Sequence, residues 1–346
     1  MLVRRQKFRP GKYWLKSLMS NSRLVAPSVN RFNSCLALFF ASFFAAGTAV
    51  ATVPESDSSI RIIVSNWTSQ IVLSNILGAV YVKMGYADEY VELDTAVQWG
   101  HLHRGMEHVQ VEVWEGTMGI DFERVSKFGN MIDAGTYDAV TREEWWYPLY
   151  VEESCLGLPD WRALRKCAPI FASDNTSLRG RYITGPWEKP ENARVRALGL
   201  DFEVIAVEKA ADLWVELEEA FREKRPIILF NWTPNSIEAQ YQGRFVEFPT
   251  YEPECETDPE WGINSDWAYD CGNPKDGWLK KAAWAGMENT WPCALGTLRS
   301  MNLDNEIIAQ VAAMVDFGGM SHQLAAQRWL EENTDLWRSW IPDRCR

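Results

Sequence analysis

The sequence lacks the short motifs by which many enzymes are recognised. Its 346 residues contain no HExxH zinc motif, no phosphate-binding loop and no GxSxG nucleophile elbow. No pair of carboxylates has a spacing that convincingly suggests a glycosidase site. Histidine is scarce, with four residues, and no CxxC pair exists, so a zinc site is disfavoured. These absences favour a binding protein over an enzyme, and they predict no catalytic residues, no bound metal and no cofactor.

Acidic residues are missing from residues 1–51, which hold eight basic residues. This segment ends in an apolar run, residues 35–51, that closes with the small-x-small pattern Ala-Val-Ala. The order predicts a secretory signal peptide over residues 1–51, cleaved near Ala51, and therefore a periplasmic protein. A membrane anchor is the alternative, but the run is short for a span. The unusual length of the basic part leaves Met19 as an alternative start.

Basic residues are also few in the rest of the chain. After residues 1–51 are removed, 27 Lys and Arg stand against 47 Asp and Glu, a net charge near −20. Such a surface argues against nucleic acid and anionic membranes as partners. Long apolar runs, internal repeats and low-complexity tracts are absent as well, so we expect a soluble monomer that binds a small molecule.

Cysteines are not scarce, and their number suggests pairing. Removal of Cys35 with the signal peptide leaves six, and an even number in an oxidising compartment predicts disulfides. Cys155 and Cys167 lie close together and are expected to pair. The other four are Cys255, Cys271, Cys293 and Cys345. They allow three connectivities, of which sequence proximity favours Cys255–Cys271.

Short apolar strands alternate with amphipathic helices along the chain. The strand patterns cover residues 60–67, 91–96, 109–114 and 227–232, and the helical patterns cover residues 69–86, 99–105, 208–225 and 305–340, the last broken at Gly318-Gly319. This alternation predicts an α/β fold with a mostly parallel sheet.

One segment, residues 251–278, departs from this pattern because it is rich in Asp, Pro, Gly and Asn. We expect a long loop held by the predicted Cys255–Cys271 disulfide. Its side-chain oxygens leave a structural calcium ion within residues 255–276 as an alternative, although the spacing matches no EF-hand. A solvated loop without a metal is the favoured interpretation.

Tryptophan is the abundant residue, with 18 in the chain. The strand patterns IIVSNW, VQVEVW and IILFNW each carry a Trp at or just past the carboxyl end, and a fourth Trp follows the segment RYITGP. These residues are Trp67, Trp114, Trp232 and Trp187. Ligands of open α/β sheets bind outside the carboxyl ends of strands, so we expect the four to line one cleft. The alternative is that they are ordinary core aromatics.

The type of side chain indicates the type of ligand. Several indoles without an abundance of Arg or His nearby favour a methylated cation, because a quaternary ammonium group donates no hydrogen bond and is held over ring faces. Aromatic faces also stack on sugars. A secreted carbohydrate-binding protein or glycoside hydrolase is therefore the alternative function.

Several motifs in order resemble one known family. They are Asn66-Trp67 after the first strand, GMEHVQVEVWEGT at residues 105–117, WWYPLYV at 145–151, GPW at 185–187, FNWTPN at 230–235 and AAQRWLEEN at 325–333. Over residues 59–340 the chain is similar to the glycine betaine and choline class of ABC-transporter substrate-binding proteins. It differs at residues 105–114, where that family usually has a Gly-Asp-x-Asp strand leading to the Trp.

The resemblance implies a two-lobed periplasmic binding protein fold (type II) with a hinge cleft. Residues 54–145 and 245–346 would form lobe I, and residues 146–244 lobe II. The Trp residues would then form a cage split between the lobes. The implied function is that of the periplasmic receptor of an ABC importer, with a permease and an ATPase in the inner membrane as partners, binding trimethylamine N-oxide, choline or glycine betaine.

Two features look more like the subgroup that handles trimethylamine N-oxide, namely the stapled insert and the run VEVWEG. Glu112 lies two residues before Trp114 and shares its strand face. Directed into the cleft, Glu112 would repel a ligand carboxylate and hydrogen-bond to a protonated oxygen or a hydroxyl group, which favours the N-oxide or choline over glycine betaine. Its alternatives are a backbone cap or a pair with a basic residue, and Glu115 is the substitute carboxylate.

A further aromatic group, WWY at residues 145–147, precedes the predicted crossover between the lobes. Trp146 is the residue of this group that we include in the predicted site. Closure of the cleft and simple packing at the crossover are equally compatible with the sequence for all three aromatic residues.

Overall fold

The computed structural model describes residues 52–173, 178–187 and 189–346. The predicted signal peptide, residues 1–51, lies outside the described residues. Among the helices within these ranges, none has the length and apolar character needed to cross a membrane.

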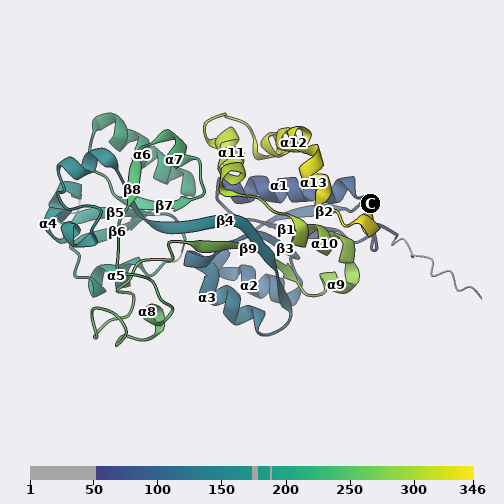
Figure 1. The fold of residues 1–346 in the computed structure, drawn as a ribbon, viewed down its shortest axis with the longest axis horizontal. Coiled ribbons are helices and arrows are strands. Elements are labelled where there is room, and N and C mark those ends of the chain that lie inside the picture. Colours follow the sequence, from purple (N-terminus) through teal and green to yellow (C-terminus); the bar gives the residue numbers. More distant parts are fainter. Residues whose placement is uncertain (1–51, 174–177, 188) are drawn as a thin grey trace, which may run out of the picture. The chain divides into compact units, whose positions relative to one another are not determined.

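The described residues form one mixed sheet of nine strands (Figure 1). The strands are β1 (Ile60–Val64), β2 (Asp88–Glu92), β3 (Val109–Trp114), β4 (Met131–Pro148), β5 (Gly180–Thr184), β6 (Phe202–Ala206), β7 (Leu229–Thr233), β8 (Gly243–Phe245) and β9 (Gly277–Trp284). Their order in the sheet is β2-β1-β3-β9-β4-β7-β5-β6, with β8 beside β4.

Parallel pairing holds in two groups of three strands. Strand β1 runs parallel to β2 and β3, and β5 runs parallel to β6 and β7. The predicted parallel arrangement describes these groups, but β4 and β9 pair antiparallel with each other and join the groups. The sequence did not predict this antiparallel centre, because β4 is bulged and its apolar residues do not alternate over its whole length.

Strand β4 belongs to both groups. Its first part pairs with β9 and its last part, from Arg142 onward, pairs with β7 and β8. The predicted lobe boundaries fall within this strand, at residues 145 and 146, and within β8, at residues 244 and 245. They remain a prediction.

The α-helices of four residues or more surround the strands. They are α1 (Thr68–Lys83), α2 (Thr95–Arg104), α3 (Glu115–Ser126), α4 (Leu164–Cys167), α5 (Glu191–Ala197), α6 (Ala210–Glu223), α7 (Ile237–Gln240), α8 (Glu254–Thr257), α9 (Met287–Thr290), α10 (Pro292–Ser300), α11 (Asn305–Asp316), α12 (His322–Glu332) and α13 (Thr334–Ser339). Short 3₁₀ helices cover Leu149–Glu153, Trp161–Ala163, Ala168–Phe171 and Asp343–Cys345.

Most helical predictions agree with the structure. One predicted strand and one helix that was not predicted differ from it in an informative way. The strand expected at residues 91–96 is β2, which ends at Glu92, because Asp94 caps α2 by accepting a hydrogen bond from the backbone of Ala96 at 2.9 Å. Helix α3 was not predicted. It starts directly after Trp114, so the strand end and the helix start share one junction.

Three disulfides join the six cysteines of the described residues. The pairs Cys155–Cys167 and Cys255–Cys271 confirm the two predictions. The third pair, Cys293–Cys345, resolves the connectivity that the sequence left open. It ties the carboxyl-terminal 3₁₀ helix to α10, while the second pair closes the loop between β8 and β9.

Candidate functional site

Two of the predicted indoles sit where strands of the first parallel group give way to helices. Trp67 is the cap residue of α1, three residues past β1, and Trp114 ends β3 and caps α3. Because β1 and β3 are parallel neighbours, their carboxyl ends meet at the same edge of the sheet. The local sequence therefore places both indoles on one wall.

The second group of strands supplies the opposite wall in the same way. Trp187 follows β5 and Trp232 lies near the end of β7, its parallel neighbour. Phe230 shares the strand face of Trp232, since the two are two residues apart. The indole N–H of Trp187 reaches across and donates a hydrogen bond to Asn66 Oδ1 at 2.8 Å.

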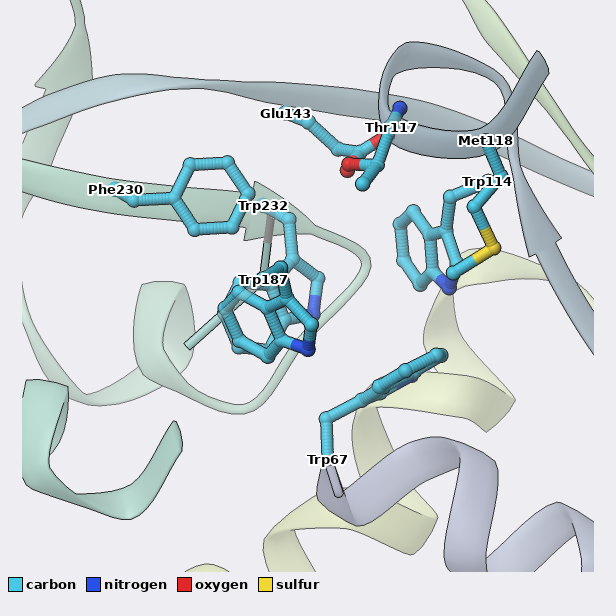
Figure 2. A pocket seen from close by; sticks show the side chains of 8 residues that line it. All are labelled: Trp67, Trp114, Thr117, Met118, Glu143, Trp187, Phe230 and Trp232. Atoms are coloured by element: carbon cyan, nitrogen blue, oxygen red, sulfur yellow. The ribbon is translucent and has the colours of Figure 1, made fainter. Parts of the chain in front are cut away.

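The two walls line a cavity of about 30 Å³. Its lining residues are Trp67, Trp114, Thr117, Met118, Glu143, Trp187, Phe230 and Trp232. Figure 2 shows the four indoles gathered around this space, with Thr117 and Glu143 together on one side of it.

The indole rings meet edge to face rather than in a stack. The ring centres of Trp67 and Trp187 are 6.3 Å apart with planes at 80°, and those of Trp187 and Trp232 are 5.4 Å apart at 89°. Edge-to-face contacts turn ring faces in different directions, so a small group between them meets several faces at once. This geometry suits a compact, rounded group such as trimethylammonium.

The polar side of the cavity is built at the start of α3. The backbone N–H of Thr117 donates to Glu143 Oε2 at 3.0 Å, and the Thr117 hydroxyl group donates to Glu143 Oε1. A helix amino terminus favours such a negative charge. Gly116 allows the approach, because a Cβ atom there would lie 2.8 Å from Glu143 Oε2.

Lys189 completes this polar side. Its ammonium group donates to Thr117 Oγ1 at 2.7 Å and lies 3.5 Å from Glu143 Oε1. The same nitrogen lies 4.0 Å from the ring centre of Phe230. Glu143 therefore faces the cavity as one half of a buried ion pair, whose lysine and carboxylate side chains are both 5% exposed.

Glu112 lies behind the cavity and does not line it. Its side chain is fully buried, and its Oε2 accepts hydrogen bonds from the indoles of Trp67 at 2.6 Å and Trp114 at 2.9 Å, and from Ser69 Oγ at 3.1 Å. Burial raises the pKa of Glu112 to about 7, although these three donors act in the opposite direction. The carboxylate is thus neither a backbone cap nor a salt bridge. It supports both indoles of one cavity wall from behind.

The aromatic group at residues 145–147 packs at the crossover. Trp146 is 1% exposed, lies outside the cavity, and presses its ring against Gly243 so closely that a Cβ atom there would be 1.8 Å from it. Trp145 stacks on Tyr182 with ring centres 3.9 Å apart. Successive strand residues point to opposite faces and β4 is covered on both faces here, so the structure does not bring Trp146 to the predicted site.

Glu115, the substitute carboxylate, is also absent from the cavity lining. Its Oε2 accepts a hydrogen bond from the backbone of Trp278 at 2.9 Å, which fixes α3 to β9. Burial raises the pKa of Glu115. The residue is placed to hold the helix that carries Thr117, rather than to meet a ligand.

The loop between β8 and β9 has an internal carboxylate of its own. Asp270 is 1% exposed, and its Oδ2 accepts a hydrogen bond from the backbone of Asn264 at 2.6 Å. In the described part of the chain no three His, Cys, Asp or Glu side chains are grouped closely enough to hold a metal ion. The calcium alternative for residues 255–276 stays a prediction.

Four lining residues were missed by sequence reasoning. They are Thr117, Met118, Glu143 and Phe230. Phe230 had a local signal, because it shares a face with Trp232. Thr117 and Met118 follow from the unpredicted start of α3. Glu143 had no local signal, since it reaches the cavity through the pairing of β4 with strands far along the chain.

The family profile described as the substrate binding domain of ABC-type glycine betaine transport systems (OpuAC) matches residues 58–332. The chain belongs to this family. OpuAC proteins are extracytoplasmic binding proteins that work with ABC transporters and are not enzymes. Membership of this family therefore argues against the alternative that the chain is a glycoside hydrolase. A small-molecule ligand and transporter partners follow at the level of the family.

Known proteins of similar sequence and structure agree with this membership. The chain is 36% identical over 299 residues to the trimethylamine N-oxide-binding protein of Pelagibacter ubique (strain HTCC1062), covering 83% of this chain and 92% of that protein. It is similar to lactococcal OpuAC in its closed form with glycine betaine, at a TM-score of 0.63 and 17% identity, covering 83% of this chain and all of that one.

A second solved structure extends the comparison. A choline-binding protein of an ABC transporter, in complex with choline, matches with a TM-score of 0.66 and 16% identity, over 83% of this chain and 94% of that one. At these identities the likeness concerns the fold. The OpuAC chain described here therefore has the predicted two-lobed α/β fold of periplasmic binding proteins.

Proposed function

We propose that this protein is the periplasmic receptor of an ABC importer for a small methylated ammonium compound, with trimethylamine N-oxide as the preferred ligand. The observation that carries the proposal is the cavity lined by four indoles with one polar side. The trimethylammonium group would lie among the ring faces, each contributing about 0.5–2 kcal/mol. The 36% identical relative named for trimethylamine N-oxide supports this ligand.

The polar side of the cavity favours a ligand with a single small oxygen. Glu143 is already matched by Lys189, so a ligand carboxylate would add an uncompensated negative charge to a nearly dry site. An N-oxide oxygen would instead accept a hydrogen bond from the ammonium group of Lys189, because the hydroxyl proton of Thr117 is already donated to Glu143. Choline, with a hydroxyl group that donates to Glu143, is the second choice, and glycine betaine is the third.

The walls of the cavity come from both predicted lobes. Trp67 and Trp114 would belong to lobe I, and Trp187 and Trp232 to lobe II. Ligand binding and closure of the lobes would then be one event, which a permease in the inner membrane can sense. Export by cleavage near Ala51 is part of the proposal, since a periplasmic receptor requires it.

Isothermal titration of the chain from residue 52 onward tests the ligand class. The ligands are trimethylamine N-oxide, choline, glycine betaine, carnitine and a neutral oligosaccharide. We expect the N-oxide to bind at least about tenfold more tightly than glycine betaine, a difference of about 1.4 kcal/mol. If none of the four methylated compounds binds and the oligosaccharide does, methylated ammonium compounds are rejected as the ligand class. A preference for glycine betaine would reject the argument from Glu143.

A further inference from the structure

Glu112 is a buried carboxylate joined to both indoles of one wall of the ligand cavity. One oxygen, Oε2, accepts the indole N–H groups of both Trp67 and Trp114. Ser69, in the first turn of α1, donates to the same oxygen. The other oxygen, Oε1, is buried and has no hydrogen-bond partner within the described part of the chain. The carboxylate therefore touches the back edges of the two rings whose faces line the cavity.

Burial of the Glu112 carboxylate without a cation beside it costs free energy of folding. Among the residues that the structure describes, no Lys, Arg or His forms an ion pair with Glu112. A buried carboxylate without a cation is normally avoided. By contrast, Glu143 has Lys189, and Glu144 has Arg194 at 2.8 Å. When ionised, Glu112 is thus a buried negative charge without a counter-charge, which a trimethylammonium group in the cavity would supply.

We propose that Glu112 is a positioning residue that selects cations: it fixes the indoles of Trp67 and Trp114 from behind, and its negative charge makes their faces more attractive to a trimethylammonium group. The inference rests on the proposed function, because it assumes that the cavity holds such a group. It differs from direct contact, since Glu112 does not line the cavity.

Two physical effects act in the same direction. A hydrogen bond from an indole N–H group to a carboxylate is charge-assisted and polarises the ring, which leaves its face more negative. In addition, the charge itself attracts a cation through a medium of low dielectric constant. Both effects strengthen the cation–π contact, and both disappear when the carboxylate is protonated or replaced by an amide.

Two neighbouring groups, Tyr137 and Lys281, bear on how the charge of Glu112 is followed through pH. Burial lowers the pKa of Lys281 to about 8, so a pH dependence is assigned to Glu112 by comparison with Glu112→Gln, which keeps Lys281. Tyr137 of β4 interacts with Glu112 electrostatically, and burial holds the pKa of Tyr137 well above its usual range, so that this phenol stays neutral. Lys281 of β9 lies over the Tyr137 ring, at 4.4 Å, and donates to the carbonyl group of Met301. The pKa of Glu112, raised to about 7, lies between those of ordinary carboxyl and amino groups.

The test compares wild type, Glu112→Gln and Glu107→Gln by isothermal titration with trimethylamine N-oxide at pH 6 and pH 8.5, or with choline if the wild type binds choline more tightly. Glu107 is the matched control, because its buried carboxylate pairs with Arg61 and His101 and does not line the cavity. We expect wild type and Glu107→Gln to bind about tenfold more tightly at pH 8.5 than at pH 6. Glu112→Gln should bind with the weak affinity at both pH values.

Each outcome decides the matter. If Glu112→Gln retains the pH dependence of the wild type, or binds within about threefold of it at pH 8.5, the inference is wrong. A loss of affinity in Glu112→Gln beside a pH-independent wild type also rejects it, because the carboxyl group then only supports the rings. A wild type that binds none of the methylated compounds rejects the proposed function instead.

A second measurement needs no variant. Binding of a cation near Glu112 should favour its ionised form, so the wild type should release protons on binding near pH 7. Titration at pH 7 in two buffers of different ionisation enthalpy measures this release. Zero release by a wild type that binds the ligand would overturn the inference even if Glu112→Gln failed to fold.

Discussion

At the scale of single residues, the cavity depends on side chains that differ in how deeply they lie. Trp67, Trp114 and Trp232 are nearly buried, yet each presents a ring to the same empty space. Glu112 lies one layer deeper and Glu143 lies at the surface of that space. The depth of each carboxylate, rather than its presence, separates a residue that meets the ligand from one that acts through the rings.

The four indoles provide the first prediction. Replacement of Trp67, Trp114, Trp187 or Trp232 by Ala should weaken trimethylamine N-oxide binding by at least about fivefold, or about 1 kcal/mol, because each removes a ring face. Calorimetric titration measures the loss. The control is Trp267→Ala, since Trp267 is 42% exposed in the loop between β8 and β9 and lies outside the cavity. If one of the four variants binds the ligand as well as this control, the Trp replaced in that variant is not part of the ligand site.

The second prediction concerns stability and pH. Burial raises the folded-state pKa of Glu112 to about 7 from 4.5, so the folded protein holds this proton more tightly than the unfolded chain. The free energy of unfolding should therefore fall as the pH rises from about 4.5 to 7, by about 3 kcal/mol from this group. The variant Glu112→Gln lacks the group and should lack this decline.

Denaturant unfolding at pH 5 and pH 8 measures this effect as a difference between the two proteins. All other titrating groups are shared, so the difference isolates Glu112. Wild type should lose stability relative to the variant at the higher pH. A gain instead would mean that the folded-state pKa lies below 4.5 and that the hydrogen bonds from the indoles outweigh burial.

At the scale of elements, the junction of β3 and α3 carries much of the site. Trp114 closes the strand, Gly116 leaves room for Glu143, and Thr117 binds that carboxylate with its backbone and its hydroxyl group. A ligand wall, a polar anchor and a helix start are thus placed within four residues. A small shift of this junction would move all of them together.

The third prediction uses two glycines of α3. In Gly116→Ala the new methyl group would lie 2.8 Å from Glu143 Oε2, which must move away from Thr117, so we expect weaker ligand binding by about tenfold and a lower melting temperature. Gly119→Ala is the matched control, because its new atom makes ordinary contacts at 3.4 Å. This control should bind normally and gain up to about 1 kcal/mol of stability from helix propensity. Equal behaviour of the two variants would contradict the role of Gly116.

The sequence predicted those parts of the site that depend on local pattern. A Trp after an apolar strand is visible along the chain, and parallel pairing brings such ends together, so the four predicted indoles line one cavity. Glu143 was not found, because a strand of 18 residues with bulges brings it to the cavity through partners more than eighty residues away. Glu112 was expected in the cleft but does not line the cavity, and alternation along a strand carries no information about what covers a residue.

At the scale of the whole chain, contacts outside the cavity lining also join the two predicted lobes. The carboxylate of Asp316, the last residue of α11, accepts hydrogen bonds from Thr68 Oγ1 at 2.7 Å and from Ser236 Oγ at 2.6 Å. Thr68 and Asp316 would belong to lobe I and Ser236 to lobe II. Closure around a ligand would therefore form the bond to Ser236, so this bond contributes to affinity without touching the ligand.

The last prediction follows from this arrangement. Ser236→Ala removes one hydrogen bond to a charged group, which is worth about 1.5–3 kcal/mol when buried and less when partly exposed, so trimethylamine N-oxide should bind about three- to tenfold more weakly. Ser339→Ala is the control, because that hydroxyl group bonds only to the carbonyl of Leu336 in its own helix. Small-angle scattering should be recorded with and without ligand. Without ligand, the fraction of molecules in the open form should be larger for Ser236→Ala than for the wild type, and unchanged for Ser339→Ala. Unchanged affinity and unchanged scattering would mean that Asp316 secures lobe I through Thr68 and takes no part in closure.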